Sequence, residues 1–249
     1  MTFDQNSNNP FSVMYPIISI ADIKEQMKGG LIPAFRDTFI HFLFATLGNE
    51  YLLLDFVNSV LENDGQPLIK SITVQNPFNP KTFVVDKNSI LDFKAISEDG
   101  NVFVVEFQTG ERSFFTDRML YYCSRTYSSQ LHEGVAYTLL HRVIGISLVT
   151  YILFSNLISP HNSFFLRATS NHDVIFSEGM QMHVLELAEA KVGLFSQLKT
   201  NLRCWMIFFY YADKKSEEEM SLLLRDNPRV ENAYIEYKRF NASSELREL

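Results

Sequence analysis

Two carboxylates and an amide lie within seventeen residues of one another near the middle of this chain. They are Asp92, in the stretch S-I-L-D-F-K, and Glu106 and Gln108, in the stretch V-V-E-F-Q. Both stretches alternate apolar and polar residues as β-strands do. Residues 98–100 between them read E-D-G, and a three-residue loop that contains glycine is typical of a β-hairpin. The sequence therefore predicts one hairpin that carries all three polar side chains.

The loop length also predicts the register of this hairpin. If Ser97 pairs with Asn101, counting outward from the turn places Asp92 opposite Glu106 on one face. Two carboxylates with Cβ atoms roughly 5 Å apart repel each other unless a cation or a proton lies between them. Oxygen ligands suit hard cations, so this pair predicts a site for Mg²⁺ or another divalent cation such as Mn²⁺, completed by waters and a substrate phosphate.

The two faces of the hairpin differ in character. The face expected to be buried is wholly apolar and holds Leu91, Phe93, Ala95, Phe103, Val105 and Phe107. On the other face the polar groups gather away from the turn; it holds Asp92, Lys94, Ile96, Val102, Val104, Glu106 and Gln108. The alternative to a metal site is a plain amphipathic hairpin, in which Asp92 pairs with Lys94 and Glu106 pairs with an arginine.

Helices and further strands are expected around the hairpin. Apolar residues at helical spacing predict helices over residues 37–47, 50–61, 113–134, 198–212, 215–225 and 229–240. In the first helix, the side chains expected to face inward are Phe39, Phe42, Leu43 and Leu47. Buried strands are expected at residues 143–154 and 164–169, and residues 1–30 are expected to form a flexible leader.

Composition narrows the class of protein. Hydrophobic residues make up 46% of the 249 residues, and the longest apolar run, residues 143–154, is too short to span a bilayer. Cys123 and Cys204 are far apart, and neither a zinc-ligand spacing nor a phosphate-binding glycine loop is present. The net charge of −7 argues against nucleic-acid binding through bulk positive charge but is compatible with a carboxylate site for cations. We expect a globular, cytoplasmic protein that does not bind a membrane.

Asp92, thirteen intervening residues and then E-F-Q resemble the signature of the PD-(D/E)XK nuclease superfamily. Further stretches resemble, more narrowly, the PD-(D/E)XK nuclease family transposases, also called recombination-promoting nucleases. These stretches are D-T-F-I-H-F-L-F from Asp37, R-M-L-Y-Y from Arg118 and Q-L-H-E-G from Gln130. The likeness covers roughly residues 34–190 and is weaker beyond them.

The resemblance implies an α/β fold with a restriction-endonuclease-like core, that is, a mixed central β-sheet flanked by helices, with C-terminal helices. The core would occupy residues 31–195, and residues 196–249 would form a helical extension packed on it. The implied activity is Mg²⁺-dependent hydrolysis of phosphodiester bonds in DNA by an endonuclease linked to recombination or mobile elements. A homodimer would suit cleavage of both strands, but the sequence leaves the oligomeric state open.

The resemblance also implies roles for individual residues. Asp92 and Glu106 would hold the metal, and the backbone carbonyl of Phe107 would be a further ligand. Asp37 would act on the metal through a water, unless it is simply the N-cap of its helix. Gln108 stands where the superfamily has lysine, so the usual positive group beside the attacking water is missing. Lys94, on the same predicted face, is either its replacement or an ordinary surface lysine.

The long helix predicted after the hairpin supplies candidate contacts to DNA. Arg118 and Arg125 are seven residues apart and so share a helix face, with Tyr121 and Gln130 nearby. The alternative is an ordinary helix surface over an aromatic core. Two functions remain open at this point: an active endonuclease, or a catalytically degenerate nuclease fold that acts as a nucleic-acid- or protein-binding module.

Overall fold

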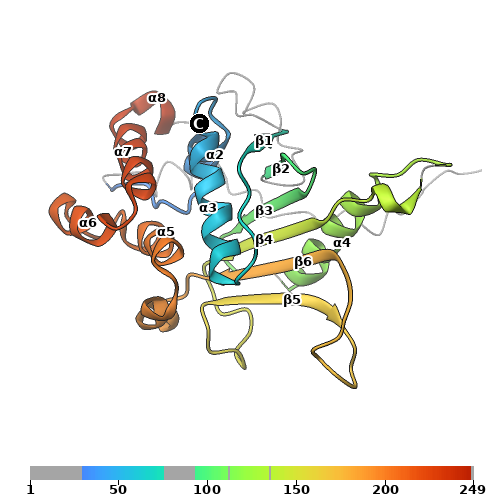
Figure 1. Ribbon diagram of the computed structural model, residues 1–249. Coiled ribbons are helices and arrows are strands. Elements are labelled where there is room, and N and C mark those ends of the chain that lie inside the picture. Colours follow the sequence, from blue (N-terminus) through green and yellow to red (C-terminus); the bar gives the residue numbers. More distant parts are fainter. Residues whose placement is uncertain (1–29, 76–92, 112, 135, 248–249) are drawn as a thin grey trace, which may run out of the picture. The chain divides into compact units, whose positions relative to one another are not determined.

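The computed structural model describes residues 30–75, 93–111, 113–134 and 136–247. These residues form a mixed β-sheet flanked by helices (Figure 1). Its strand order is β1-β2-β3-β4-β6-β5; β3, β4 and β6 are parallel, and the other neighbours are antiparallel. The strands are β1 (Ile72–Val74), β2 (Phe93–Ser97), β3 (Val102–Gln108), β4 (Val143–Val149), β5 (His161–Arg167) and β6 (Ile175–Glu186). The predicted mixed sheet flanked by helices is confirmed.

The sheet and its helices belong to one compact unit, Ile32–Leu249. The predicted leader lies, except for Gly30, outside the described residues. The helices are α2 (Asp37–Ala45), α3 (Glu50–Asn63), α4 (Phe115–Ser128), α5 (Thr200–Tyr211), α6 (Glu217–Leu224), α7 (Pro228–Ala242) and α8 (Ser244–Arg247), with short 3₁₀ segments at Tyr137–Leu139 and Glu189–Gln197.

The hairpin of β2 and β3 has the predicted register. The Ser97 amide donates to the Asn101 carbonyl at 3.0 Å, and the pairing continues to Phe93 opposite Val105. Gly100 has a φ of 85°, and a Cβ there would lie 2.4 Å from the ring of His141, so only glycine fits the turn. Asp92 lies outside the described residues, and its position opposite Glu106 stays a prediction.

Both faces of β3 are covered. On one face the ring centroid of Phe107 lies 5.9 Å from that of Phe44 on α2 and 5.6 Å from that of Phe209 on α5. The predicted apolar face is therefore buried wherever the structure describes it. On the other face, Met119 and Cys123 of α4 pack with a cluster that includes Val104. Glu106 and Gln108 thus lie at the end of a strand whose second face is also largely core.

The C-terminal helices pack against α2 and α3. The Trp205 indole N–H donates to Asp55 at 2.8 Å, and the Tyr237 hydroxyl donates to the carbonyl of Ile32 at 2.7 Å. Two helix starts are capped by side chains: Ser216 and Glu219 form a capping box on α6, and Asn227 caps α7 ahead of Pro228. These caps explain why the helices begin close to the positions that the sequence indicates.

Some predicted boundaries were wrong. Leu47 is 79% exposed rather than inward, because α2 ends at Ala45. The helix predicted over residues 113–134 spans only Phe115–Ser128; near its end the hydroxyls of Ser128 and Ser129 bond to carbonyls three residues earlier, which competes with further helix. Strand β6 was missed because Ser, Glu, Gly, Gln and His interrupt its apolar pattern.

Among the described residues, no single helix is long and apolar enough to cross a bilayer; α2 and α3 meet the length and hydropathy requirements only together, as a pair bent by 105°.

Candidate active site

Glu106 and Gln108 point from the end of β3 toward α4 and meet one arginine there. Nη2 of Arg118 donates to Oε1 of Glu106 at 2.5 Å and to Oε1 of Gln108 at 2.7 Å. The Gln108 amide nitrogen donates to the carbonyl of Thr109 at 2.9 Å, which leaves its oxygen turned toward the arginine. The acid and the amide of the E-x-Q motif are thus joined through a single guanidinium nitrogen.

Burial differs within this cluster. The side chain of Glu106 is 8% exposed, whereas that of Arg118 is 21% exposed. The guanidinium carbon of Arg118 lies 5.4 Å from the ring centroid of buried Phe115, a cation–π contact that helps to hold it in place.

Burial, and secondarily the negative charge of Glu106, raises the pKa of the Cys123 thiol to about 12, so this cysteine stays protonated and plays no nucleophilic part.

Two further residues share the face of Glu106. Ser147 on β4 pairs with Glu106 in the parallel register, is 1% exposed, and its hydroxyl has no hydrogen-bond partner among the described residues. Lys94 pairs with Val104, which makes it a diagonal neighbour of Glu106 on the same face, as the predicted register requires. Sequence reasoning missed Ser147, since the only signal is one hydroxyl in the apolar run V-I-G-I-S-L-V.

The other candidate ligands lie in different surroundings. Asp37 is exposed and is the first residue of α2, whose N-cap is Arg36, so the N-cap interpretation of Asp37 was wrong. Helix α2 packs on the Phe107 side of the sheet, opposite the side that Glu106 faces. The ring of Phe107 is buried in the aromatic core. Metal roles for Asp37 and for the Phe107 carbonyl stay predictions.

The candidate DNA contacts on α4 divide into two groups. Tyr121 and Arg125 are exposed. Gln130 instead uses both ends of its amide on the backbone of His141, at 3.0 Å and 2.9 Å, and thereby ties the chain after α4 to the start of β4. Arg118 faces the sheet rather than solvent. The structure therefore brings Arg118 to the E-x-Q motif and leaves Tyr121 and Arg125 on the surface.

The chemistry of this cluster fits a hard divalent cation. The Glu106 carboxylate, the Gln108 amide oxygen and the Ser147 hydroxyl supply oxygen donors on one face, which is the ligand type that Mg²⁺ prefers. Within the described ranges, which exclude residues 76–92, no group of three or more His, Cys, Asp or Glu side chains could hold a metal. Asp92, the second carboxylate that the sequence predicts as a ligand, lies outside the described residues.

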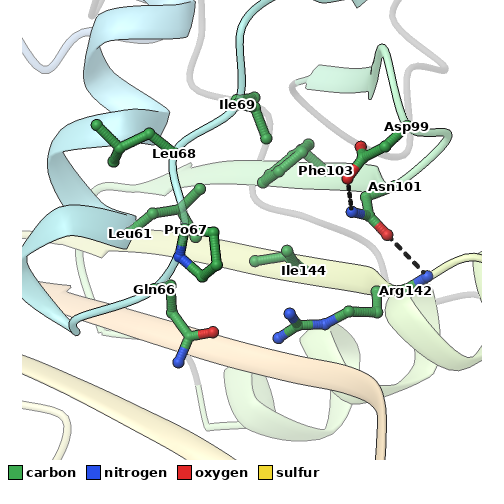
Figure 2. A pocket seen from close by; sticks show the side chains of 10 residues that line it. All are labelled: Leu61, Gln66, Pro67, Leu68, Ile69, Asp99, Asn101, Phe103, Arg142 and Ile144. Atoms are coloured by element: carbon green, nitrogen blue, oxygen red, sulfur yellow. Dashed lines mark hydrogen bonds between the residues drawn. The ribbon is translucent and has the colours of Figure 1, made fainter.

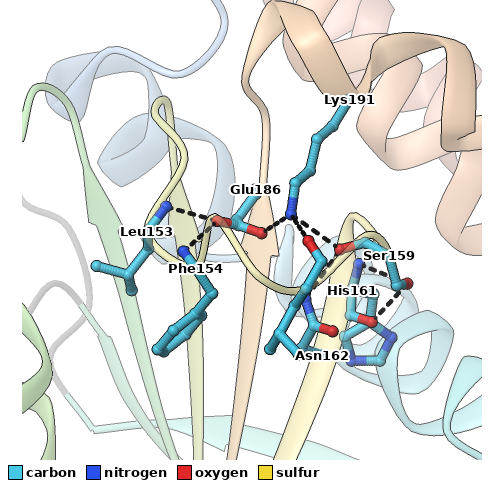
Figure 3. A network of polar contacts seen from close by, with 8 residues as sticks. Leu153, Phe154, Ser159, His161, Asn162, Glu186 and Lys191 are labelled. Carbon is cyan, nitrogen blue, oxygen red and sulfur yellow. Dashed lines mark hydrogen bonds and ion pairs between the residues drawn. The ribbon is translucent and has the colours of Figure 1, made fainter.

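A second buried carboxylate, Glu186, ends strand β6 (Figure 3). One of its oxygens accepts the amides of Leu153 and Phe154 at 2.5 Å and 2.9 Å, and the other pairs with the ammonium of Lys191. Lys191 also donates to the carbonyls of Leu157 and Ser159 at 2.8 Å and 3.2 Å. This network fastens the loop after β4 to the end of β6.

Two histidines form a buried pair on the face opposite α4. Nε2 of His161 lies 2.9 Å from Nδ1 of His183, and Asn63 lies 2.7 Å from Nδ1 of His161. Burial lowers the pKa of His161 to about 4 and that of His183 to about 3. Both rings are therefore neutral near pH 7.

A small cavity of about 100 Å³ lies beside the turn of the hairpin, at the end of the sheet away from Glu106 (Figure 2). The Asn101 side chain donates to Asp99 at 2.8 Å and accepts the backbone N–H of Arg142 at 3.2 Å. The cavity is separate from the cluster around Glu106.

The fold and the cluster together define a class of protein, a restriction-endonuclease-like α/β protein with an acidic motif at the end of a central strand. A family profile described as PD-(D/E)XK nuclease family transposase matches residues 34–249, and the chain belongs to this family. The match extends past residue 190, so it includes the C-terminal helices. Comparisons with curated proteins and with solved structures found no match.

Family membership supports a nuclease-like function, for which DNA is the implied substrate. PD-(D/E)XK nucleases generally use divalent metal ions, in agreement with the oxygen donors gathered at Glu106.

Proposed function

We propose that this protein is a divalent-metal-dependent DNA endonuclease of recombination or mobile elements, with Mg²⁺ or Mn²⁺ as its cofactor. The observation that carries this proposal is the position of Glu106. It is a buried carboxylate at the motif position of the family, beside the amide of Gln108 and within reach of a partly exposed arginine. Burying a carboxylate is costly, and such groups concentrate at functional sites.

In this proposal Asp92 and Glu106 hold the metal, the Phe107 carbonyl is a further ligand, and Asp37 acts through a water. A bound divalent ion would lower the pKa of a water and polarise the scissile phosphate. Gln108 can orient a water through its amide but cannot serve as a general base. The exposed side chains of Tyr121 and Arg125 on α4 are the candidate contacts to DNA.

The test is nicking of supercoiled plasmid by the full chain in Mg²⁺, in Mn²⁺ and in EDTA. We expect metal-dependent nicking by the wild type and by Asp173→Ala. Asp173 is an exposed carboxylate between β5 and β6, at the opposite end of the sheet. Asp92→Ala and Glu106→Ala should reduce nicking to the level seen in EDTA. A wild-type chain that never nicks DNA, or a Glu106→Ala chain that nicks normally, would contradict the proposal.

Two observations favour a second candidate, a degenerate nuclease fold that binds nucleic acid or protein. Gln108 replaces the motif lysine, and Glu106 is engaged by Arg118 as in the plain amphipathic alternative. Gel-shift measurements in EDTA and in Mg²⁺ distinguish the two. Binding of labelled DNA without cleavage in either condition would support the binding module.

A further inference from the structure

On the basis of the proposed endonuclease function, we infer that Arg118 supplies the positive charge that lysine supplies in the superfamily's PD-(D/E)XK motif and that Gln108 lacks. The charge would thus come from α4 rather than from β3. Its task would be to orient the attacking water and to stabilise negative charge on the scissile phosphate.

The position of the guanidinium supports this role. Nη2 of Arg118 contacts both motif side chains, Glu106 at 2.5 Å and Gln108 at 2.7 Å. A lysine at position 108 would extend from the same backbone position on the same face, so its ammonium would lie where the guanidinium now lies. Gln108 accepts a hydrogen bond from Arg118, whereas a lysine there would repel it. Gln108 and Arg118 are therefore complementary residues that together replace one lysine.

Arg118 also retains the capacity to bind a phosphate. Its guanidinium is always charged and carries five N–H donors. Nη2 serves Glu106 and Gln108, while the donors of Nε and Nη1 have no acceptor among the described residues. The side chain is 21% exposed and its guanidinium lies over the Phe115 ring, so it is accessible and yet oriented. The donors on Nε and Nη1 are therefore available for hydrogen bonds to phosphate oxygens.

Lys94 is the competing source of positive charge. It lies diagonal to Glu106 on β2 and is half-buried. Arg118 is favoured because it bonds to both residues of the E-x-Q motif and faces the site directly from α4.

The experiment uses substitutions that move the positive charge from position 118 on α4 to position 108 on β3. Arg118→Gln should lower the rate of plasmid nicking about 100- to 1000-fold, the size of effect seen when one charge-stabilising donor is lost. Gln108→Lys alone places two cations together and should be less active than wild type. The double variant Arg118→Gln/Gln108→Lys should recover at least about tenfold over Arg118→Gln, because it restores one cation at the motif. Arg239→Gln, an exposed arginine on α7, is the matched control and should cleave normally.

A second readout does not depend on cleavage. Mn²⁺ binding, measured by calorimetry on each full-length variant, should be as tight or tighter in Arg118→Gln than in wild type, since a cation beside Glu106 has been removed. Loss of nicking with retained Mn²⁺ binding and an unchanged melting temperature identifies Arg118 as the charge donor rather than a structural residue. If Arg118→Gln does not fold, Arg118→Lys takes its place, and it should retain part of the activity.

Two outcomes overturn the inference alone: a wild-type rate in Arg118→Gln, or a folded double variant that binds Mn²⁺ but is no more active than Arg118→Gln. Normal nicking by Arg118→Gln together with a deep loss in Lys94→Ala would assign the charge to Lys94. A wild-type chain that does not nick at all overturns the proposed function, and this inference with it.

Discussion

Glu106 and Glu186 are two buried carboxylates at the same end of the parallel strands β3 and β6, which β4 separates, and they are held in different ways. Gln108, Val149 and Glu186 share one register row across β3, β4 and β6, so the two sites lie at the same edge of the sheet. Glu186 is fully buried, and its oxygens meet two backbone amides and a lysine that is 6% exposed. Glu106 meets an arginine that is 21% exposed. One carboxylate is enclosed by the protein, and the other lies next to a cation that reaches solvent.

This difference in burial indicates a structural role for Glu186 and a functional role for Glu106. A buried ion pair whose members have all their hydrogen bonds is hard to dismantle, because removal of one partner leaves an uncompensated charge. Glu186 and Lys191 have this character and connect two loops. A carboxylate beside a partly solvated guanidinium can exchange that partner for a metal ion or a substrate at smaller cost. We therefore expect substitutions around Glu186 to change stability and those around Glu106 to change activity.

The largest effect on stability is expected for Lys191→Met. It leaves Glu186 buried beside an apolar side chain and should lower the free energy of unfolding by about 3–5 kcal/mol. Urea denaturation measures the change. Lys238→Met is the matched control, since it removes an exposed pair with Glu217 and should cost less than about 1 kcal/mol. Equal losses in the two variants would mean that the buried Glu186–Lys191 pair matters no more to stability than an exposed pair does.

Gln108→Ala tests the other site. It removes one orienting hydrogen bond without removing a charge, so the nicking rate should fall roughly ten- to a thousand-fold, less than for Glu106→Ala. Its free energy of unfolding should change by less than about 1.5 kcal/mol. A loss of stability as deep as that of Lys191→Met, measured in the same urea titration, would place Gln108 with the structural network instead.

The histidine pair should make the fold sensitive to acid. The folded-state pKa values of His161 and His183, about 4 and about 3, lie below the ordinary value of 6.5, so the unfolded chain takes up protons first as the pH falls. Stability is then complete above pH 6.5 and declines toward pH 3, with a loss on the order of 2 kcal/mol for each histidine, or about 4 kcal/mol for the pair, by pH 5. Unfolding free energies at pH 5 and pH 7 measure this loss. The double variant His161→Gln/His183→Gln should show a weaker pH dependence, whereas exposed His172→Gln should match wild type; an unaltered pH profile in the double variant would argue against a neutral pair.

The smallest effect is expected for Ser147→Ala. The hydroxyl of Ser147 has no partner among the described residues, so its removal should leave the free energy of unfolding unchanged or raise it by up to about 1 kcal/mol. Thermal melting would detect the change. A clear loss of stability would mean that the hydroxyl has a structural partner and that Ser147 resembles the enclosed Glu186 site.

Local signals in the sequence were sufficient for several elements. The E-D-G loop and the alternation on each side predicted the register from Ser97–Asn101 to Phe93–Val105, because a short hairpin leaves few pairings open. Helical periodicity and capping residues predicted α3, α6 and α7 closely. The motif at Glu106 and Gln108, and the family that it indicates, could also be identified from the sequence.

Only the tertiary structure decided what surrounds that motif. Ser147 reaches Glu106 because β4 pairs in parallel with β3, and parallel pairing depends on a long crossover that no local pattern specifies. Arg118 was one of two arginines on a predicted helix surface, and its approach to Glu106 and Gln108 depends on how α4 crosses the sheet. Glu186 ends β6, a strand that was not predicted because polar residues interrupt its apolar pattern. Short-range geometry is determined by sequence neighbours, whereas the burial and pairing of charges depend on contacts between distant elements.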